Sequence, residues 1–389
     1  MRGTIQPYAW GSTTFLPELL GTEPTDEPQA ELWLGAHSSA SATVDGRPLD
    51  EVIAADPAGV VGAAAVEEFG PGLPFLLKVL AIAKPLSLQA HPTRAQAEQG
   101  YAREEAAGIA ADASDRLYKD DWPKPEMLVA LVDSEALCGF RNPEASYDLF
   151  GQLGVPAATA LVAPLVDAAL TPDRRLAAVF ESALRLARDD LGVVADVVAA
   201  ARGIEVAGDL GLFARTAREL GEHYPDNPGV LAALLMNRVS VRPGQAVFLP
   251  AGNLHAYLHG AGVEIMANSD NVMRGGLTPK HVDADELLAI LDFTPGFPGY
   301  VEPVEESPGC WRYPTPAPEF ALWRLEPDGS PVEAPGTGSG RVLLVTEGSV
   351  DVGGLTLTRG QAAFASAGEK LRLDGTGTAF VAGPGVHAP

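Results

Sequence analysis

Positive charge is scarce in this sequence of 389 residues. Lys and Arg number 27 against 51 Asp and Glu, which gives a formal net charge of -24 at pH 7. A surface with this excess of acid does not attract phosphodiester backbones or anionic lipid. We therefore expect neither a nucleic-acid partner nor a membrane partner.

A long apolar run and a targeting segment are also lacking. The most apolar stretch, residues 73–83, is interrupted by Lys78 and is far shorter than the roughly 18 to 20 residues that a membrane span needs. The first ten residues have no apolar core of a signal peptide and no Arg-rich transit pattern. The two cysteines, Cys138 and Cys310, match no metal-binding spacing, so we expect reduced thiols and a cytoplasmic protein.

Turn-forming residues are abundant instead, with 42 Gly and 33 Pro. They separate short apolar runs between Ala30 and Ala90, such as 42–44 and 75–82, which predict strands. The sequence Thr93-Arg-Ala-Gln96 then resembles a capping box that opens a helix through about Ala111.

The character of the chain changes twice more. Leu and Ala at helical spacing predict an all-helical block over about 146–237, and strands resume at Val239. A Pro-rich stretch, 295–318, is typical of a linker or an arm that crosses between domains. The remainder to residue 389 predicts short strands joined by Gly turns.

One strand and turn occur twice in the sequence. Residues 244–255 (GQAVFLPAGNLH) align with residues 360–371 (GQAAFASAGEKL) at a constant offset of 116. The first copy resembles the second motif of the cupin superfamily, except that His259 stands where that motif has Asn. In the second copy Leu371 replaces the motif's His. The resemblance implies two cupin barrels, of which the second has lost its metal.

Four residues form a candidate metal site within this pattern. Gln89 and His91 lie on one face of a predicted strand, because side chains alternate along a strand. His255 ends the cupin motif, and Glu126 opens another apolar run. In metal-binding cupins such His and Glu positions bind a metal, and a ligand set without thiolate favours Zn²⁺, with manganese, iron or cobalt as alternatives. Taken alone, Glu126 is better explained as a capping residue or as the ion-pair partner of Lys124 than as a metal ligand.

Further segments resemble the family of type I mannose-6-phosphate isomerases, also called phosphomannose isomerases. The resemblance covers residues 8–281 and implies a zinc-binding cupin with an inserted helical domain and a C-terminal cupin without metal. The matching segments are Tyr8–Ser12 (YAWGS), Ala30–His37 (AELWLGAH), Lys84–Pro92 (KPLSLQAHP), Tyr118–Asp120 (YKD), Lys124–Met127 (KPEM), Cys138–Arg141 (CGFR), Pro250–Tyr257 (PAGNLHAY) and Ser269–Lys280 (SDNVMRGGLTPK).

The resemblance implies a reaction and a ligand set. The reaction is the interconversion of mannose 6-phosphate and fructose 6-phosphate through a cis-enediol, with one zinc ion held by the four candidate ligands. Arg274 and Lys280 would be a cationic pair near the sugar phosphate. Ser87 shares a strand face with Gln89 and His91, so its hydroxyl is a candidate phosphate contact. The alternative is that these are ordinary surface cations and a strand hydroxyl.

The group that moves the proton stays open. Lys124, Glu264 and Asp270 are the candidates, and Trp10 and Glu31 would line the cavity. The family commonly has His where this chain has Pro123, so a mechanism that uses that His does not apply here. The alternative for Glu264 is a structural carboxylate neutralised by Arg274.

We therefore expect a mainly β monomer of three domains. The expected boundaries are 1–145 plus 238–300 for a metal-binding cupin jelly roll, 146–237 for the helical insertion, and 301–389 for the second cupin. Two other functions remain: a metallo-cupin dioxygenase, and a sugar-sensing cupin without catalysis. A sugar sensor would need a DNA-binding or partner-binding domain. Only the helical block is a candidate, and it lacks a basic recognition helix.

Overall fold

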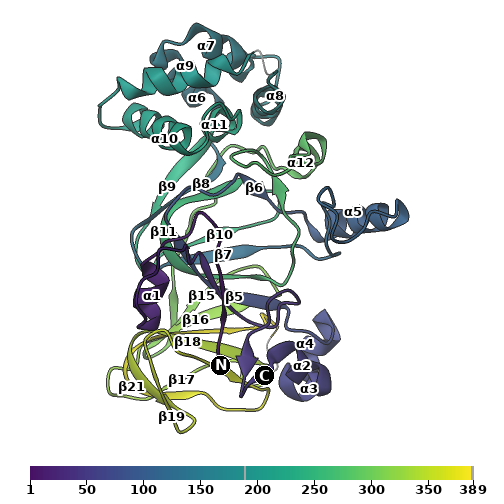
Figure 1. Ribbon diagram of the computed structural model, residues 1–389, viewed down its shortest axis with the longest axis vertical. Helices are drawn as coiled ribbons and strands as arrows, with labels where there is room; N and C mark the ends of the chain where they lie inside the picture. Colours follow the sequence, from purple (N-terminus) through teal and green to yellow (C-terminus); the bar gives the residue numbers. More distant parts are fainter. Residues whose placement is uncertain (188–189, 387–389) are drawn as a thin grey trace.

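The computed structural model describes residues 1–187 and 190–386 of the chain. Two antiparallel sheets lie against each other, and a layer of helices caps the end of the first sheet away from the second (Figure 1). Apolar side chains of both sheets, among them Leu77 and Val79 from the first and Leu344 and Phe380 from the second, form one shared core cluster. The sheet-rich fold agrees with the expected mainly β class.

The first sheet has eleven strands and carries most of the candidate site residues. Its longest strand, β11, pairs with β5 and β7 on one part of its length and with β6 and β8 on the other. The strands are β1 (Thr4–Gln6), β2 (Glu31–Leu34), β5 (Phe75–Ile82), β6 (Gln89–Ala90), β7 (Glu126–Ala130), β8 (Ser134–Phe140), β9 (Met236–Val241), β10 (Ala246–Leu249), β11 (His255–Ala267), β12 (Met273–Arg274) and β13 (Tyr300–Val301). A separate hairpin joins β3 (Thr43–Val44) to β4 (Arg47–Pro48).

The second sheet repeats part of the first. Its strands are β14 (Val304–Ser307), β15 (Cys310–Tyr313), β16 (Ala321–Leu325), β17 (Val332–Glu333), β18 (Arg341–Val352), β19 (Leu355–Thr358), β20 (Ala362–Ala365) and β21 (Arg372–Gly383). The bounds of β20 are those of β10 plus 116, and β21 ends 116 residues after β11. Gly244 and Gly360 both adopt positive φ, at 82° and 81°, so the repeated turn has the same backbone conformation in both copies.

Short helices pack beside the first sheet, and for three of them the sequence prediction was wrong. The stretch from Ala30 to Ala90 was expected to be strands and turns, yet it contains α2 (Leu49–Ala55), α3 (Pro57–Val60) and α4 (Ala63–Phe69). These helices are too short for a clear helical period, which is why alternation of turns and apolar residues misled the prediction. Another short helix, α1 (Phe15–Leu20), precedes them.

The capping box at Thr93 is confirmed. Gln96 N–H donates to Thr93 Oγ1 at 3.3 Å, and Gln96 Oε1 accepts from the backbone N–H of Thr93 at 2.8 Å. Helix α5 begins at Arg94 and ends at Ala106, five residues before the predicted end at about Ala111.

Helices follow one another through the predicted helical block. It begins three residues earlier than expected, because Asn142 caps α6 with Pro143 as its first residue. It also ends earlier, since β9 begins at Met236. The helices are α6 (Pro143–Leu153), α7 (Pro156–Leu161), a 3₁₀ turn (Ala163–Val166), α8 (Pro172–Leu184), α9 (Gly192–Arg202), α10 (Asp209–His223) and α11 (Gly229–Ala233), and α12 (Ala284–Ile290) packs beneath them.

The Pro-rich stretch passes from one sheet to the other. Within it β13 pairs with β10 of the first sheet, and β14 pairs with β15 of the second. The segment is thus an arm that crosses between sheets, and it contributes three short strands as it does so. None of the described helices is long and apolar enough to cross a membrane.

Candidate metal and sugar-phosphate site

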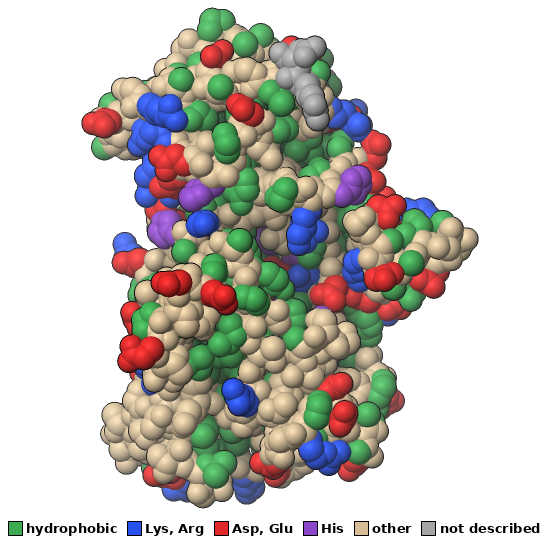
Figure 2. Space-filling view, in the orientation of Figure 1, with side chains coloured by type: hydrophobic (Ala, Val, Ile, Leu, Met, Phe, Trp, Pro, Cys, Tyr) green, Lys and Arg blue, Asp and Glu red, His purple; other side chains and the backbone are tan. Residues whose placement is uncertain are grey.

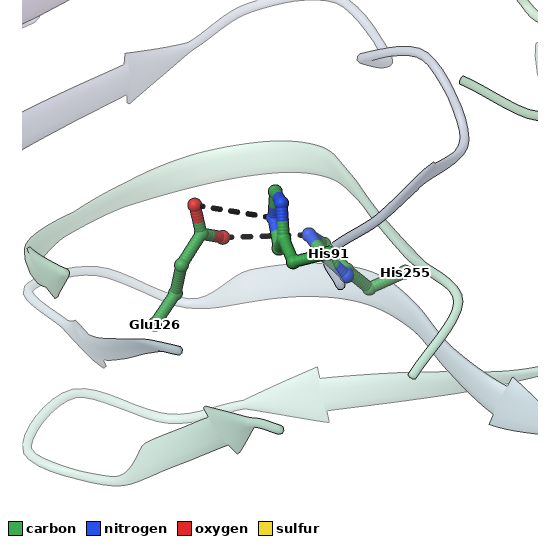
Figure 3. Close-up of side chains that lie close together, drawn as sticks. All are labelled: His91, Glu126 and His255. Atoms are coloured by element: carbon green, nitrogen blue, oxygen red, sulfur yellow. Dashed lines mark ion pairs between the residues drawn. The ribbon is translucent and has the colours of Figure 1, made fainter. Parts of the chain in front are cut away.

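Three predicted ligands meet inside the first sheet. His91 Nε2 lies 3.3 Å from Glu126 Oε1, and His255 Nε2 lies 3.4 Å from Glu126 Oε2 (Figure 3). Their ligand atoms all lie within 4.8 Å of one another, and all three side chains are buried. The segments that carry them are the end of β6, the start of β7 and the start of β11.

Backbone carbonyls orient both imidazoles. His91 Nδ1 donates to the carbonyl of Asn271 at 2.7 Å, and His255 Nδ1 contacts the carbonyl of Asn253 at 3.1 Å. Because a carbonyl only accepts, these contacts put the hydrogen of a neutral ring on Nδ1 and leave Nε2 as a lone pair. His91 Nε2 is buried without a hydrogen-bond partner, so its lone pair is available to bind an electrophile such as a metal ion.

The protonation of these groups suits a metal ion. Burial lowers the pKa of His91, which keeps the ring neutral. Burial alone would raise the pKa of Glu126, but neighbouring positive charge, that of Lys124 included, holds it well below its usual range. Two imidazoles and one carboxylate form a set that zinc prefers, and no thiolate competes, because burial raises the pKa of the neighbouring Cys138 to about 12.

Gln89 connects this triad to the cavity. In β6 it pairs with His255 on one side and with Arg274 of β12 on the other. Its half-buried side chain lines the cavity beside the triad. The register therefore places the fourth predicted ligand, Gln89, between His255 and the predicted substrate cation Arg274.

A row of buried charges lies further along the same strands. Lys78 of β5 pairs in register with Trp33 of β2 and with Glu264 of β11. Its Nζ lies 3.2 Å from Glu31 Oε2 and 3.6 Å from Glu264 Oε2. Burial would lower the pKa of Lys78, but the two carboxylates outweigh it and raise that pKa, so the ammonium is retained. The alternative that Arg274 neutralises Glu264 is wrong, since Lys78 does so.

Glu264 has an unusual environment for a carboxyl. Burial, and after it the charge of Glu126, raises the pKa of Glu264 to about 7. Tyr257 Oη donates to Glu264 Oε1 at 3.1 Å. Sequence reasoning missed Lys78 and Tyr257; the one signal was a lysine that interrupts an otherwise apolar strand.

A cavity of about 620 Å³ opens beside the triad. Figure 2 shows Lys, Arg and His side chains around a hollow in the middle of this face, below the helical layer. Eight of the predicted site residues line it: Trp10, Glu31, Ser87, Gln89, Lys124, Asp270, Arg274 and Lys280. Lys78, Trp33, His37 and Tyr8 line it as well, whereas His91, Glu126, His255 and Glu264 are buried and are not among its lining residues.

Two of the lining cations are without acidic partners. Burial lowers the pKa of Arg274, and burial together with Arg274 lowers the pKa of Lys280. In the part of the chain that the structure describes, no carboxylate lies within ion-pair distance of either side chain. In a chain with a charge of -24, such unpaired cations favour an anionic ligand.

The remaining candidates have protein partners. Lys124 Nζ lies 3.2 Å from Glu126 Oε1. Glu126 therefore pairs with Lys124 and also contacts the two histidines of the triad. Asp270 Oδ1 lies 3.3 Å from His37 Nε2, and this contact first of all lowers the pKa of Asp270. Trp10 stacks on Tyr8 at 5.9 Å between ring centroids.

The fold and the site thus define a sheet-rich protein with a buried site of two histidines and one carboxylate that fits a metal, beside a cavity with unpaired cations. A family model described as the catalytic domain of type I phosphomannose isomerase matches residues 1–143. The chain belongs to the mannose-6-phosphate isomerase family.

Relatives over nearly the whole chain carry this assignment. The chain is 37% identical to the mannose-6-phosphate isomerase of Salmonella typhimurium over 387 residues, which covers 96% of each chain. It is 30% identical to that of Homo sapiens over 407 aligned positions, covering 95% of this chain and 93% of the relative.

Solved structures agree with the sequence relatives. A crystal structure of mannose 6-phosphate isomerase in its zinc-bound holo form superposes with a TM-score of 0.89 at 35% identity and covers 98% of both chains. The apo form from Salmonella typhimurium superposes with a TM-score of 0.90 at the same identity and coverage.

Proposed function

We propose that the protein interconverts mannose 6-phosphate and fructose 6-phosphate and that it uses one zinc ion per chain. The observation that carries the proposal is the buried His91, Glu126 and His255 triad next to a cavity with the unpaired cations Arg274 and Lys280. A sugar phosphate matches both halves of this arrangement, since the phosphate needs cations and the reacting carbonyl needs an electrophile.

Gln89 would complete the ligand set with His91, Glu126 and His255. Bound zinc supplies a Lewis acid that polarises the sugar's C1 or C2 oxygen. The zinc-bound relative supports this choice of metal.

Isomerisation requires a group that moves a proton between C1 and C2. Of the three candidates, Lys124 lies on the cavity wall and contacts the ligand Glu126. Glu264 does not line the cavity. Asp270 lines it, but its carboxylate is paired with His37. We therefore assign the transfer to Lys124 Nζ, which would have to act as the free amine: it takes the proton from C2 and returns it to C1, while the hydroxyl proton passes from the C2 oxygen to the C1 oxygen.

Lys78 would complement Lys124. Its ammonium is fixed between two carboxylates and faces the cavity, so it can donate to the oxygen on which negative charge develops in the enediol step. Lys78 thereby keeps its proton throughout.

Arg274, Lys280 and Ser87 would bind the phosphate group. The guanidinium offers two parallel donors to phosphate oxygens, and Lys280 adds a charge from the loop that follows. Trp10 and Glu31 also line the cavity, and Glu31 keeps Lys78 in place.

The finer architecture follows the same interpretation. The repeated β10 and β20 turns support two jelly-roll barrels, with a metal centre in the barrel of 1–145 plus 238–300 and none in that of 301–389, where Leu371 replaces the histidine. The helices of the block 146–237, which lies in sequence between the two parts of the first barrel, would be an insertion into that barrel. Since one chain supplies the whole site, and both described cysteines are free thiols, we propose a cytoplasmic monomer.

The other two functions find less support. A dioxygenase reaction does not require the cations Arg274 and Lys280. A sugar sensor does not require a buried Lys78 that stabilises developing charge. Loading the protein with Fe²⁺ and measuring oxygen uptake tests the first alternative.

Coupled turnover assays test the proposal directly. We expect turnover of mannose 6-phosphate, far slower turnover of glucose 6-phosphate, and loss of both after treatment with a chelator. Binding of mannose 6-phosphate without turnover in zinc-loaded protein would contradict isomerase activity and favour a sensor.

A further inference from the structure

Asn271 fastens two distant segments together behind the cavity wall. Its side chain is fully buried. Asn271 Oδ1 accepts from the backbone N–H of Lys119 at 2.8 Å, and Nδ2 donates to the backbone carbonyls of Asp120 and Trp122, both at 2.8 Å. Both ends of the amide are therefore satisfied by a segment about 150 positions away in the chain.

The carboxylate of Asp120 in turn binds the segment that carries Asn271. It accepts from Ser269 Oγ at 2.8 Å and from the backbone N–H of Asp270 at 2.9 Å, and also from the N–H of Trp122 at 2.9 Å. We call these reciprocal bonds the Asp120–Asn271 clamp. Neither residue faces the cavity, so the clamp acts through its neighbours.

One neighbour is a proposed metal ligand. The backbone carbonyl of Asn271 receives the Nδ1 hydrogen of His91 at 2.7 Å. This bond fixes the ring orientation and keeps the hydrogen away from Nε2, the atom that faces Glu126. The position of that carbonyl depends on the clamp, because the side chain of Asn271 has no freedom to move.

The other neighbour lines the cavity. Asp270 is fixed by the clamp at its backbone N–H and by His37 at its carboxylate, at 3.3 Å. His37 is oriented in turn, since its Nδ1 lies 3.2 Å from the backbone N–H of Ser39, which only donates. His37 therefore presents the Nε2 hydrogen to Asp270.

We propose that Asp120 and Asn271 are positioning residues for the metal centre, which keep His91 in the orientation and tautomer that retain the ion. The inference rests on the ligand set of the proposed function. It adds that metal retention is controlled by residues that touch neither the metal nor the substrate.

Metal dissociation from zinc-loaded protein tests the clamp without any assay of activity. The protein is mixed with an excess of a chromogenic chelator and the rate of zinc transfer is recorded. We expect Asn271→Ser to accelerate transfer by about 10- to 100-fold, the range typical of lost outer contacts to a ligating histidine. Asn268→Ser is the matched control: Asn268 lies in the same turn, but its Nδ2 donates to Leu73 O at 3.2 Å, so the rate should equal that of the wild type.

A second variant applies if Asn271→Ser does not fold. Asp120→Asn replaces one acceptor oxygen by an NH2 group that cannot accept, so either Asp270 N–H or Trp122 N–H loses its acceptor, and we expect faster transfer again. His37→Gln distinguishes the effect of the clamp on His91 from its effect on Asp270, because it alters only the contact of His37 with Asp270. It should leave the zinc transfer rate unchanged and raise KM more than it lowers kcat.

The outcomes are distinguishable. Wild-type transfer rates in folded Asn271→Ser and Asp120→Asn would overturn the clamp and leave the proposed function intact. A wild-type protein that retains no zinc at all would overturn the ligand set itself.

Discussion

His255 and Arg274 flank Gln89 in adjacent strands, yet the proposed function gives them different roles. His255 contacts Glu126 within the triad, whereas Arg274 lines the cavity without an acidic partner. The two residues therefore allow the metal site and the substrate site to be separated experimentally.

We expect His255→Ala to lose both metal and activity, because it removes one of two imidazoles. Arg274→Ala should retain the metal and lose turnover by about 100- to 1,000-fold, as for the loss of one preorganised donor. Elemental analysis and a coupled assay on the same preparations measure both quantities. Wild-type metal content in the His255 variant would show that the ligand assignment is wrong.

Lys78 shows why part of the site was invisible in the sequence. The apolar run 75–82 predicted strand β5 correctly, and the Lys within it had no periodic signal of its own. Its partners Glu31 and Glu264 come from strands 47 positions before and 186 positions after it. Only the pairing of β2, β5 and β11 brings them together, and pairing over such separations is not encoded locally.

At the scale of elements, helix α5 supports the segment that carries the clamp. Glu104 of α5 accepts the backbone N–H groups of Leu117 at 3.1 Å and of Tyr118 at 2.8 Å, just before Asp120. The N-terminus of α5 depends in turn on the capping box of Thr93 and Gln96.

Thr93→Ala should lower the free energy of unfolding by about 1 kcal/mol, the usual loss for a helix cap. Urea unfolding followed by circular dichroism measures the change. Thr171→Ala is the control, because Thr171 stands at the same position of α8 but makes no side-chain cap hydrogen bond. An equal loss in both variants would mean that the capping bonds of Thr93 contribute nothing.

Glu135 joins the helical layer to the first sheet. It forms ion pairs with Arg238 of β9 and with Arg215 of α10, the latter at 2.6 Å. Burial would raise the pKa of Glu135, but the hydrogen bonds of the two guanidinium groups outweigh it and lower that pKa to about 2. The carboxylate thus stabilises the folded state above the pKa of the unfolded chain, and this stabilisation is lost as pH falls towards 2.

We expect Glu135→Gln to be less stable than the wild type by on the order of 2 kcal/mol at pH 7, allowing for solvent screening. The difference should shrink as pH falls from 5 to 3, because the Glu135 carboxylate of the unfolded wild-type chain becomes protonated in this range while that of the folded protein stays ionised. Unfolding curves at several pH values measure it. Glu144→Gln, which alters an exposed pair with Arg175, should change stability little. A difference that stays constant between pH 7 and 3 would refute the assignment.

Much of the fold was accessible from the sequence, for reasons that differ between elements. The offset of 116 predicted equivalent strands because a Gly at positive φ closes each turn. Helices α2 to α4 were missed because fewer than eight residues show no clear helical period. The clamp was missed because Asp120 and Asn271 meet only after the loops are placed by both β7 and β11.

For the whole molecule, a net charge of -24 opposes an anionic substrate. Arg274 and Lys280 attract the phosphate at short range, while the distant acids are screened beyond about 8 to 10 Å at physiological salt. We expect kcat/KM to rise slightly or stay constant as ionic strength increases from very low values. A steep fall over that range would mean that a larger cationic surface steers the substrate.

The central claim is that turnover of the sugar phosphate depends on a metal held by His91, Glu126 and His255. Titration of metal-free protein with Zn²⁺, followed by the rate of mannose 6-phosphate isomerisation, tests it most directly. We predict a rate that rises linearly and levels off at about one equivalent per chain, as for a single tight site. Undiminished turnover in the metal-free protein would contradict the account.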